Sequence, residues 1–166
     1  MNTISTQMPR RYRTPAATLL AAAATGTIGL ESVLLFLIIF FWTPPHFWAL
    51  SLWRAEEYAR AGIPMLPVVA GRAETRRQIL LYSIILAPVG ASPWLLGYAG
   101  LLYGVTAVVA GAAMIGLSLH IMALGDEDEG LRAAKRLFGV SILYLFVLFA
   151  VLLIDHLLGA PGRALL

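Results

Sequence analysis

The sequence predicts an all-α, polytopic transmembrane helix bundle of about five spans. Of its 166 residues, 60% are hydrophobic and only 13% are charged, whereas roughly a quarter of the residues of a soluble domain are charged. Residues 32–52, 78–125 and 137–154 contain no Asp, Glu, Lys or Arg. Crossing the hydrocarbon core takes about 20 apolar residues in a helix, and irregular backbone facing lipid would leave its polar groups unpaired. These three stretches therefore predict membrane-spanning helices.

The expected spans cover residues 15–29, 30–53, 79–96, 101–124 and 137–158. The first is weak and rich in Ala and Thr, whereas the second contains the unbroken apolar run 33–41. Pro88 and Pro93 are expected to bend or break the third span. The bundle thus extends over residues 15–158, between an N-terminal segment, 1–14, and a C-terminal tail, 159–166.

The positions of Lys and Arg predict the orientation, because cytoplasmic loops carry an excess of both. With five spans, the cations at 10–13, 54–77 and 132–136 share one side and only Arg163 lies on the other. The N-terminus is therefore expected in the cytoplasm and the C-terminus outside. No apolar core precedes Arg10, so no cleavable signal peptide is expected. The net charge is +3. Because the Lys and Arg residues lie beside the spans, their role in membrane orientation explains this charge, and no nucleic-acid partner is expected. The lack of Cys excludes disulfides, thiolate catalysis and Cys-ligated metal.

A polar and aromatic cluster at residues 41–48 is the first candidate site. Pro44 and Pro45 remove two amide donors, and broken backbone at membrane depth is tolerated where it lines a cavity or is buried in protein. His46 follows this expected break. If the helix resumes after Pro45, His46, Leu50, Trp53 and Glu57 share one helix face. Arg54 lies beside this face. An imidazole, an indole, a carboxylate and a guanidinium would then line one wall.

These residues also have purely structural interpretations. Tryptophans such as Trp42 are typical of an interfacial aromatic belt, and a lone intramembrane histidine can form a helix–helix hydrogen bond. An ionisable residue within a span is nevertheless a functional candidate by default, which favours a functional role for His46. His120 lacks such a context and is expected to pack. Asp155 and His156 are interpreted as a solvated helix end.

The long connection 54–77 keeps apolar residues and two prolines, so it is expected to pack as a cap. Glu56 and Glu57 open it, and paired carboxylates near a membrane surface are typical of Mg²⁺ sites that bridge to substrate phosphates. The alternative is a solvated acidic pair that offsets Arg54 and Arg60. The acidic run at 126–129 is interpreted as a solvated loop.

Several sequence blocks together resemble one family. They are Phe-Trp-Thr-Pro-Pro-His-Phe-Trp-Ala-Leu at 41–50, Glu57-Tyr58, Ala-Gly-Ile-Pro-Met-Leu-Pro-Val at 61–68, Arg-Gln-Ile-Leu-Leu-Tyr at 77–82, Ala-Lys-Arg-Leu-Phe at 134–138 and Tyr-Leu-Phe at 144–146. The chain resembles the protoheme IX farnesyltransferases, or haem O synthases, of the UbiA superfamily of intramembrane prenyltransferases. The resemblance covers about residues 22–156.

The resemblance implies an enzyme of the bacterial inner membrane that moves farnesyl from farnesyl diphosphate to a vinyl group of haem B. It implies Mg²⁺ bound by acidic motifs that hold the diphosphate. Carried over, Glu56 and Glu57 are expected to bind the metal, and His46 and Glu57 to act in catalysis. The expected substrate-binding residues are Trp42, Arg54, Tyr58, Arg76 and Arg77.

The chain departs from the family in its N-terminal part. Family members are considerably longer, and their first acidic motif combines Asn and Asp. Here the only Asn is Asn2 and no Asp precedes Asp126. The chain is therefore expected to match a C-terminal half-bundle, truncated and poorly active without an N-terminal half. The alternatives are a non-catalytic haem-binding or oxidase-assembly membrane protein and a transporter fragment.

Overall fold

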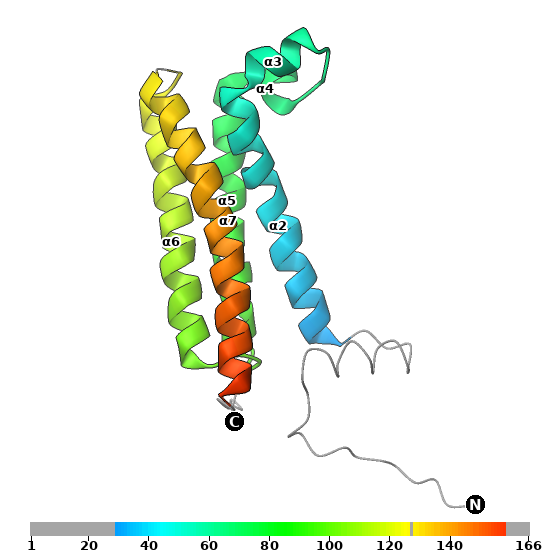
Figure 1. Cartoon of the computed structure of the whole chain (residues 1–166), viewed down its shortest axis with the longest axis vertical. Coiled ribbons are helices and arrows are strands. Elements are labelled where there is room, and N and C mark those ends of the chain that lie inside the picture. The colour runs from blue at the N-terminus through cyan, green and yellow to red at the C-terminus, as the bar shows by residue number, and fades with distance from the viewer. Residues whose placement is uncertain (1–28, 127, 159–166) are drawn as a thin grey trace, which may run out of the picture.

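The computed structural model describes residues 29–126 and 128–158 as an all-α bundle (Figure 1). Within these residues, four helices are long and apolar enough to cross a membrane, and the chain is an integral membrane protein. Residues 15–28 of the expected span 15–29 lie outside the described residues. The helices are α2 (Leu30–Trp53), α3 (Ala55–Arg60), α4 (Leu66–Val69), α5 (Gly71–Leu95), α6 (Leu101–Leu124) and α7 (Asp128–Leu157).

The four long helices run side by side, and each packs mainly against two others (Figure 1). Helix α5 packs against α2 and α6, and α7 packs against α6 and α2. The short helices α3 and α4 lie at one end of the bundle, beside the end of α2 and the start of α5, as expected for a packed cap. The α6–α7 turn lies at the same end. Every Lys and Arg of the described residues is therefore at this end, which we call the cationic end.

Helices α5 and α7 begin before their expected spans, and the prolines do not interrupt the spanning helices. Helix α5 begins at Gly71 and α7 at Asp128, so the last acidic residues of the 126–129 run start a helix instead of forming a loop. Pro44 and Pro45 lie inside α2, and Pro88 and Pro93 inside α5. The expected break at Pro44 and Pro45 was wrong, and Pro88 and Pro93 do not break α5. Neighbouring helices and hydroxyl side chains can satisfy the freed carbonyls. The hydroxyl of Ser92 donates to the carbonyl of Val89, 2.6 Å away, which Pro93 would otherwise leave unpaired.

Hydroxyl groups and small residues join the helices inside the bundle, as is usual where lipid removes the hydrophobic drive for association. Ser83 of α5 and Ser118 of α6 are hydrogen-bonded at 2.9 Å. The phenol of Tyr103 on α6 donates to the carbonyl of Gly90 on α5 at 2.8 Å. A Cβ atom at Gly90 would lie 2.2 Å from the hydroxyl of Tyr144 on α7. Close approach of α5, α6 and α7 therefore requires glycine at this position.

Asp155 is not the solvated helix end that the sequence suggested. Its side chain is buried, and its carboxylate accepts a hydrogen bond of 3.1 Å from the backbone N–H of Tyr103 in the first turn of α6. The N-cap of α6 is Gly100, which has no side chain that could accept hydrogen bonds from the first amides of the helix. Asp155 of α7 accepts one of these bonds instead. A negative charge is also stabilised by the helix dipole at this N-terminus. His120, expected to pack, is instead exposed on α6.

We expect Asp155→Ala to lower the free energy of unfolding by about 1–2 kcal/mol, the usual cost of losing a helix cap. Asp155→Asn should lose less, because an amide oxygen still accepts the Tyr103 N–H. Thermal unfolding in detergent micelles, followed by circular dichroism, measures both. His156→Ala at the exposed neighbouring position is the control. Equal melting temperatures for all three variants would contradict the capping role.

We expect Gly104→Ala to destabilise the α5–α6 contact. An added Cβ atom would lie 2.4 Å from the indole of Trp94, and overpacking of this kind costs about 1–3 kcal/mol. Gly116→Ala is the matched control on the same helix, because a Cβ atom there meets nothing within 4 Å. The same unfolding assay should show a lower melting temperature for Gly104→Ala only.

Candidate functional site

His46 lies in the seam between α2 and α7, as the middle of three stacked rings. Trp42 is one helical turn earlier on α2, and its ring centroid is 4.3 Å from that of the imidazole with an interplanar angle of 18°. Phe138 of α7 covers the imidazole at 4.5 Å and 22°. The stack holds the imidazole plane in one orientation within a spanning helix.

Ser141, one turn from Phe138 on α7, fixes the edges of the same rings. The indole N–H of Trp42 donates to the backbone carbonyl of Ser141 at 2.7 Å. The hydroxyl oxygen of Ser141 lies 2.7 Å from Nδ1 of His46, and the hydroxyl also contacts the carbonyl of Phe138 at 2.7 Å. Ser141 is fully buried. One serine thus links both α2 side chains to α7, away from water.

The seam continues to the cationic end through Trp53, which lies two turns after His46 on the same face of α2. The guanidinium of Arg54 lies 4.7 Å from the Trp53 ring centroid, and the ammonium of Lys135 lies 4.8 Å from it. Both contacts are cation–π interactions. Within residues 29–126 and 128–158, the buried indole nitrogen of Trp53 has no hydrogen-bond partner. Two cations therefore converge where the seam reaches the membrane surface.

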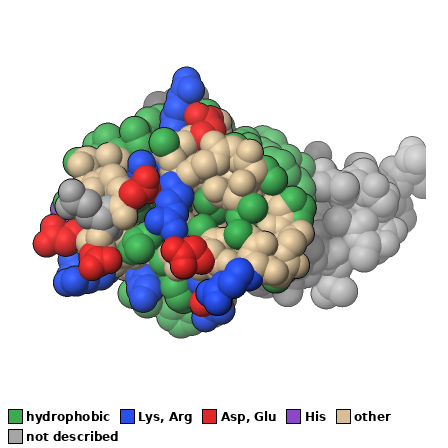
Figure 2. All heavy atoms as spheres, turned by 90° about the horizontal axis from the view of Figure 1, so that it is seen from above, with side chains coloured by type: hydrophobic (Ala, Val, Ile, Leu, Met, Phe, Trp, Pro, Cys, Tyr) green, Lys and Arg blue, Asp and Glu red, His purple; other side chains and the backbone are tan. Residues whose placement is uncertain are grey.

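The acidic pair lies on α3 at this end, where Lys and Arg mix with Asp and Glu on the surface (Figure 2). Glu57 faces Arg54 at 3.4 Å and Glu56 faces Arg72 at 3.9 Å, and both carboxylates are exposed. Consecutive helix positions point in different directions, so each carboxylate meets a different arginine. The described part of the chain gathers no three His, Asp or Glu side chains that could hold a metal ion. The pair alone supplies only part of a metal site.

Two of the expected substrate-binding arginines, Arg76 and Arg77, are engaged in ion pairs with residues outside the seam. Arg76 is paired with Asp126 of the α6–α7 turn and is largely covered. Arg77 lies 3.7 Å from Glu74 and is exposed. Tyr58 is half-buried on α3. The structure thus brings Trp42 to His46 and Arg54 to Glu57, and it leaves Arg76 and Arg77 in separate ion pairs.

Sequence reasoning missed Phe138, Ser141 and Lys135 as parts of the site. Ser141 had one usable signal, because it is the single Ser, Thr, Asn or Gln in the apolar run 137–154. Lys135 and Phe138 belong to the block that carried the family resemblance. Their spacing of three also places them on one face of a helix.

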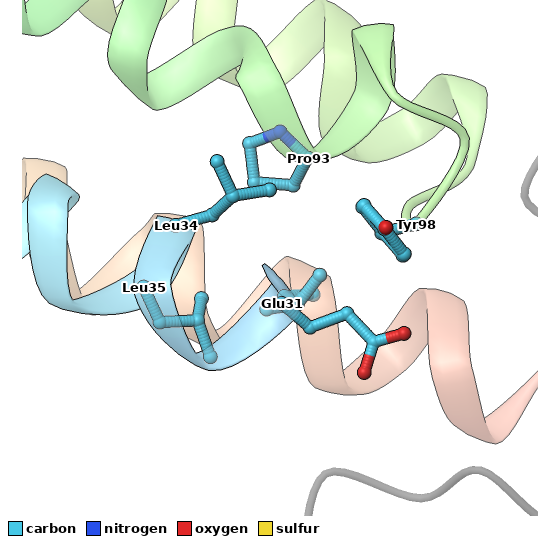
Figure 3. Close-up of a pocket in the computed structure, with 6 residues that line it drawn as sticks. Glu31, Leu34, Leu35, Pro93 and Tyr98 are labelled. Carbon is cyan, nitrogen blue, oxygen red and sulfur yellow. The ribbon is translucent and has the colours of Figure 1, made fainter. Parts of the chain in front are cut away.

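The described part of the bundle has an apolar groove on α7 and a separate cavity at one end. An apolar groove of about 640 Å³ begins at Trp42 and follows α7 away from the cationic end, lined by Trp42, Ile142, Leu145, Phe146, Phe149, Ala150 and Leu153. A cavity of about 80 Å³ lies at the opposite end of the bundle from α3, between α2, α5 and α7. Figure 3 shows Glu31, Pro93 and Tyr98 around it. Of these two, the groove adjoins the His46 stack, because Trp42 lines it.

A family model for the UbiA prenyltransferases matches residues 13–143. The chain belongs to this family. It is 60% identical over 139 residues to the protoheme IX farnesyltransferase of Nitrobacter hamburgensis, covering 84% of this chain and 45% of that protein. It is 60% identical over 136 residues to that of Azorhizobium caulinodans, covering 82% and 44%. No solved structure matches the chain.

The chain spans less than half the length of these curated relatives. Its match nevertheless covers both sides of the seam, because residues 13–143 include Trp42 and His46 as well as Phe138 and Ser141. The family region therefore contains the whole stack.

We expect Trp42→Phe to lower the free energy of unfolding by about 1 kcal/mol, the ordinary net contribution of one hydrogen bond. Phenylalanine keeps a ring against His46 but loses the donor to the Ser141 carbonyl. Trp48→Phe is the control, because the Trp48 indole packs edge-on against Tyr82 and has no hydrogen bond within the described residues. Denaturation in mixed micelles measures both variants, and equal losses would argue against the Trp42 bond.

Proposed function

We propose that this chain forms the C-terminal part of a protoheme IX farnesyltransferase, which transfers farnesyl from farnesyl diphosphate to a vinyl group of haem B. The observation that carries the proposal is the Trp42–His46–Phe138 stack, which sits at membrane depth beside an apolar groove and below a cationic end. A site for these substrates needs all three environments, because both molecules combine a large apolar part with anionic groups.

The groove suits the prenyl chain. It starts at Trp42 and extends along α7 from Ile142 to Leu153. These two α7 residues are eleven positions apart, so the groove follows about 16 Å of helix. Its lining residues are all apolar apart from the Trp42 indole nitrogen, which is bonded to Ser141. A farnesyl chain in the groove would bring its reactive end beside His46 and its diphosphate toward the cationic end.

The cationic end suits the anionic groups of both substrates. Arg54 and Lys135 lie over Trp53, and arginine binds carboxylate or phosphate oxygens in bidentate fashion. We assign the haem propionates or the diphosphate to these two cations. Arg76 and Arg77 stay candidates for diphosphate binding if their partners Asp126 and Glu74 are exchanged for substrate oxygens.

Mg²⁺ is the metal that the acidic pair suits, because Mg²⁺ takes oxygen ligands and is usually held by one or two carboxylates plus substrate phosphates. Glu56 and Glu57 are exposed and adjoin the cations that would meet the diphosphate. The bound metal would neutralise charge on the leaving diphosphate. The remaining ligands would come from substrate, water and the part of the enzyme that the longer relatives carry.

We expect haem O only when this chain is paired with an N-terminal half. The chain is expressed in bacteria that lack their own haem O synthase, with and without the N-terminal half of the Nitrobacter hamburgensis relative, and extracted haems are identified by chromatography and mass. Robust haem O from the chain alone would refute the need for a second half. Tight haem binding without haem O in either case would favour the non-catalytic haem-binding alternative.

In the paired system, His46→Ala and Glu57→Gln should each reduce haem O by about a hundredfold or more, the usual range for a group acting on the reacting atoms. Glu129→Gln is the control, because Glu129 is an exposed carboxylate in the first turn of α7. Membrane levels of each variant are compared by immunoblot. Unchanged haem O in His46→Ala would remove His46 from the site.

A further inference from the structure

The Ser141 hydroxyl has two neighbours at hydrogen-bond distance but a single hydrogen. The backbone carbonyl of Phe138, 2.7 Å away, can only accept. The same hydroxyl oxygen lies 2.7 Å from Nδ1 of His46. Both contacts are hydrogen bonds only if the hydroxyl donates to the carbonyl and accepts a proton that Nδ1 carries.

The opposite tautomer would be costly at this buried position. If Nδ1 were unprotonated, the serine hydrogen could serve either Nδ1 or the Phe138 carbonyl, and the other pair would become two acceptors at 2.7 Å. A buried polar contact without its hydrogen bond is expensive. Rotation of the ring by 180° would keep both stacks, but it would replace Nδ1 with a carbon and so lose the contact with Ser141.

We propose that Ser141 is a positioning residue that fixes the tautomer of His46, with the proton on Nδ1 and the lone pair on Nε2. Within the described residues, Nε2 has no protein partner. Nor is Nε2 a buried atom: the buried polar side-chain atoms without a partner in this part of the chain are the indole nitrogen of Trp53 and the hydroxyl of Tyr144. The free acceptor of His46 is therefore accessible from outside the core.

The chemical consequence rests on the proposed function. When the C–O bond of farnesyl diphosphate breaks, its electron pair leaves with the diphosphate. The π electrons of the haem vinyl group then form the new C–C bond and leave a carbocation. That cation either loses a proton or is captured by water, which then loses a proton. Both routes release one proton, and Nε2 of His46 is the acceptor that receives it.

The test reads the tautomer directly and uses neither haem nor a prenyl donor. The chain is prepared with ¹⁵N-histidine and placed in lipid nanodiscs, and the two ring nitrogens of His46 are assigned by NMR at a pH where the ring is neutral. We expect Nδ1 to be the protonated, pyrrole-type nitrogen. His120 and His156, both exposed, are internal references. A protonated Nε2 in the unaltered chain would overturn the proposal, whether or not any variant folds.

Ser141→Ala should change the tautomer ratio of His46 by about fivefold or more, which corresponds to one ordinary hydrogen bond. Trp42 keeps its bond in this variant, because its acceptor is the backbone carbonyl of residue 141. Ser83→Ala, which removes another buried hydroxyl from the bundle, should leave His46 unchanged. An unaltered ratio in Ser141→Ala would also overturn the proposal. Failure of the haem O assay with the expected tautomer would count against the proposed function alone.

Discussion

A polar group in hydrocarbon cannot pair with water, so its partner must come from the protein. This constraint determines where the helices of the bundle touch. Ser83 meets Ser118, Tyr103 meets Gly90, and Asp155 reaches the first turn of α6. The α2–α7 seam follows the same rule, since the Ser141 backbone and hydroxyl pair with Trp42 and His46. The candidate site therefore occupies a contact that the bundle needs for its own assembly.

The site separates two kinds of chemistry along the membrane normal. The imidazole and the apolar groove lie within the spanning region, where substrate carbon chains partition. The carboxylates and guanidinium groups lie at the cationic end, where anionic groups stay hydrated until they bind. Trp53 connects the two regions, because it continues the face of His46 and contacts both Arg54 and Lys135. A substrate with an apolar body and an anionic head would be oriented by this separation before any specific contact formed.

The sequence predicted the fold class and the existence of the four described spans, because lipid requires long stretches without charge. It also singled out Trp42, His46 and Glu57. It did not predict where α5 and α7 begin. Both helices continue beyond the apolar span into charged residues, and hydropathy marks only the apolar part. Nor could it find Ser141 for His46 or Asp155 for Tyr103. Those pairs are 95 and 52 residues apart, and they depend on the rotation of each helix about its axis.

The paired prolines of α2 change the mechanics of that helix. Residues 44 and 45 are prolines inside α2 and have no amide hydrogen, so the carbonyls of Phe40 and Phe41 receive no backbone hydrogen bond from the following turn. Bending α2 at this level breaks fewer hydrogen bonds than bending it elsewhere. The contacts of His46 with Ser141 and of Trp53 with Lys135 lie just beyond these prolines. Helix α7 therefore braces α2 at the level where the backbone hydrogen bonds of α2 are fewest.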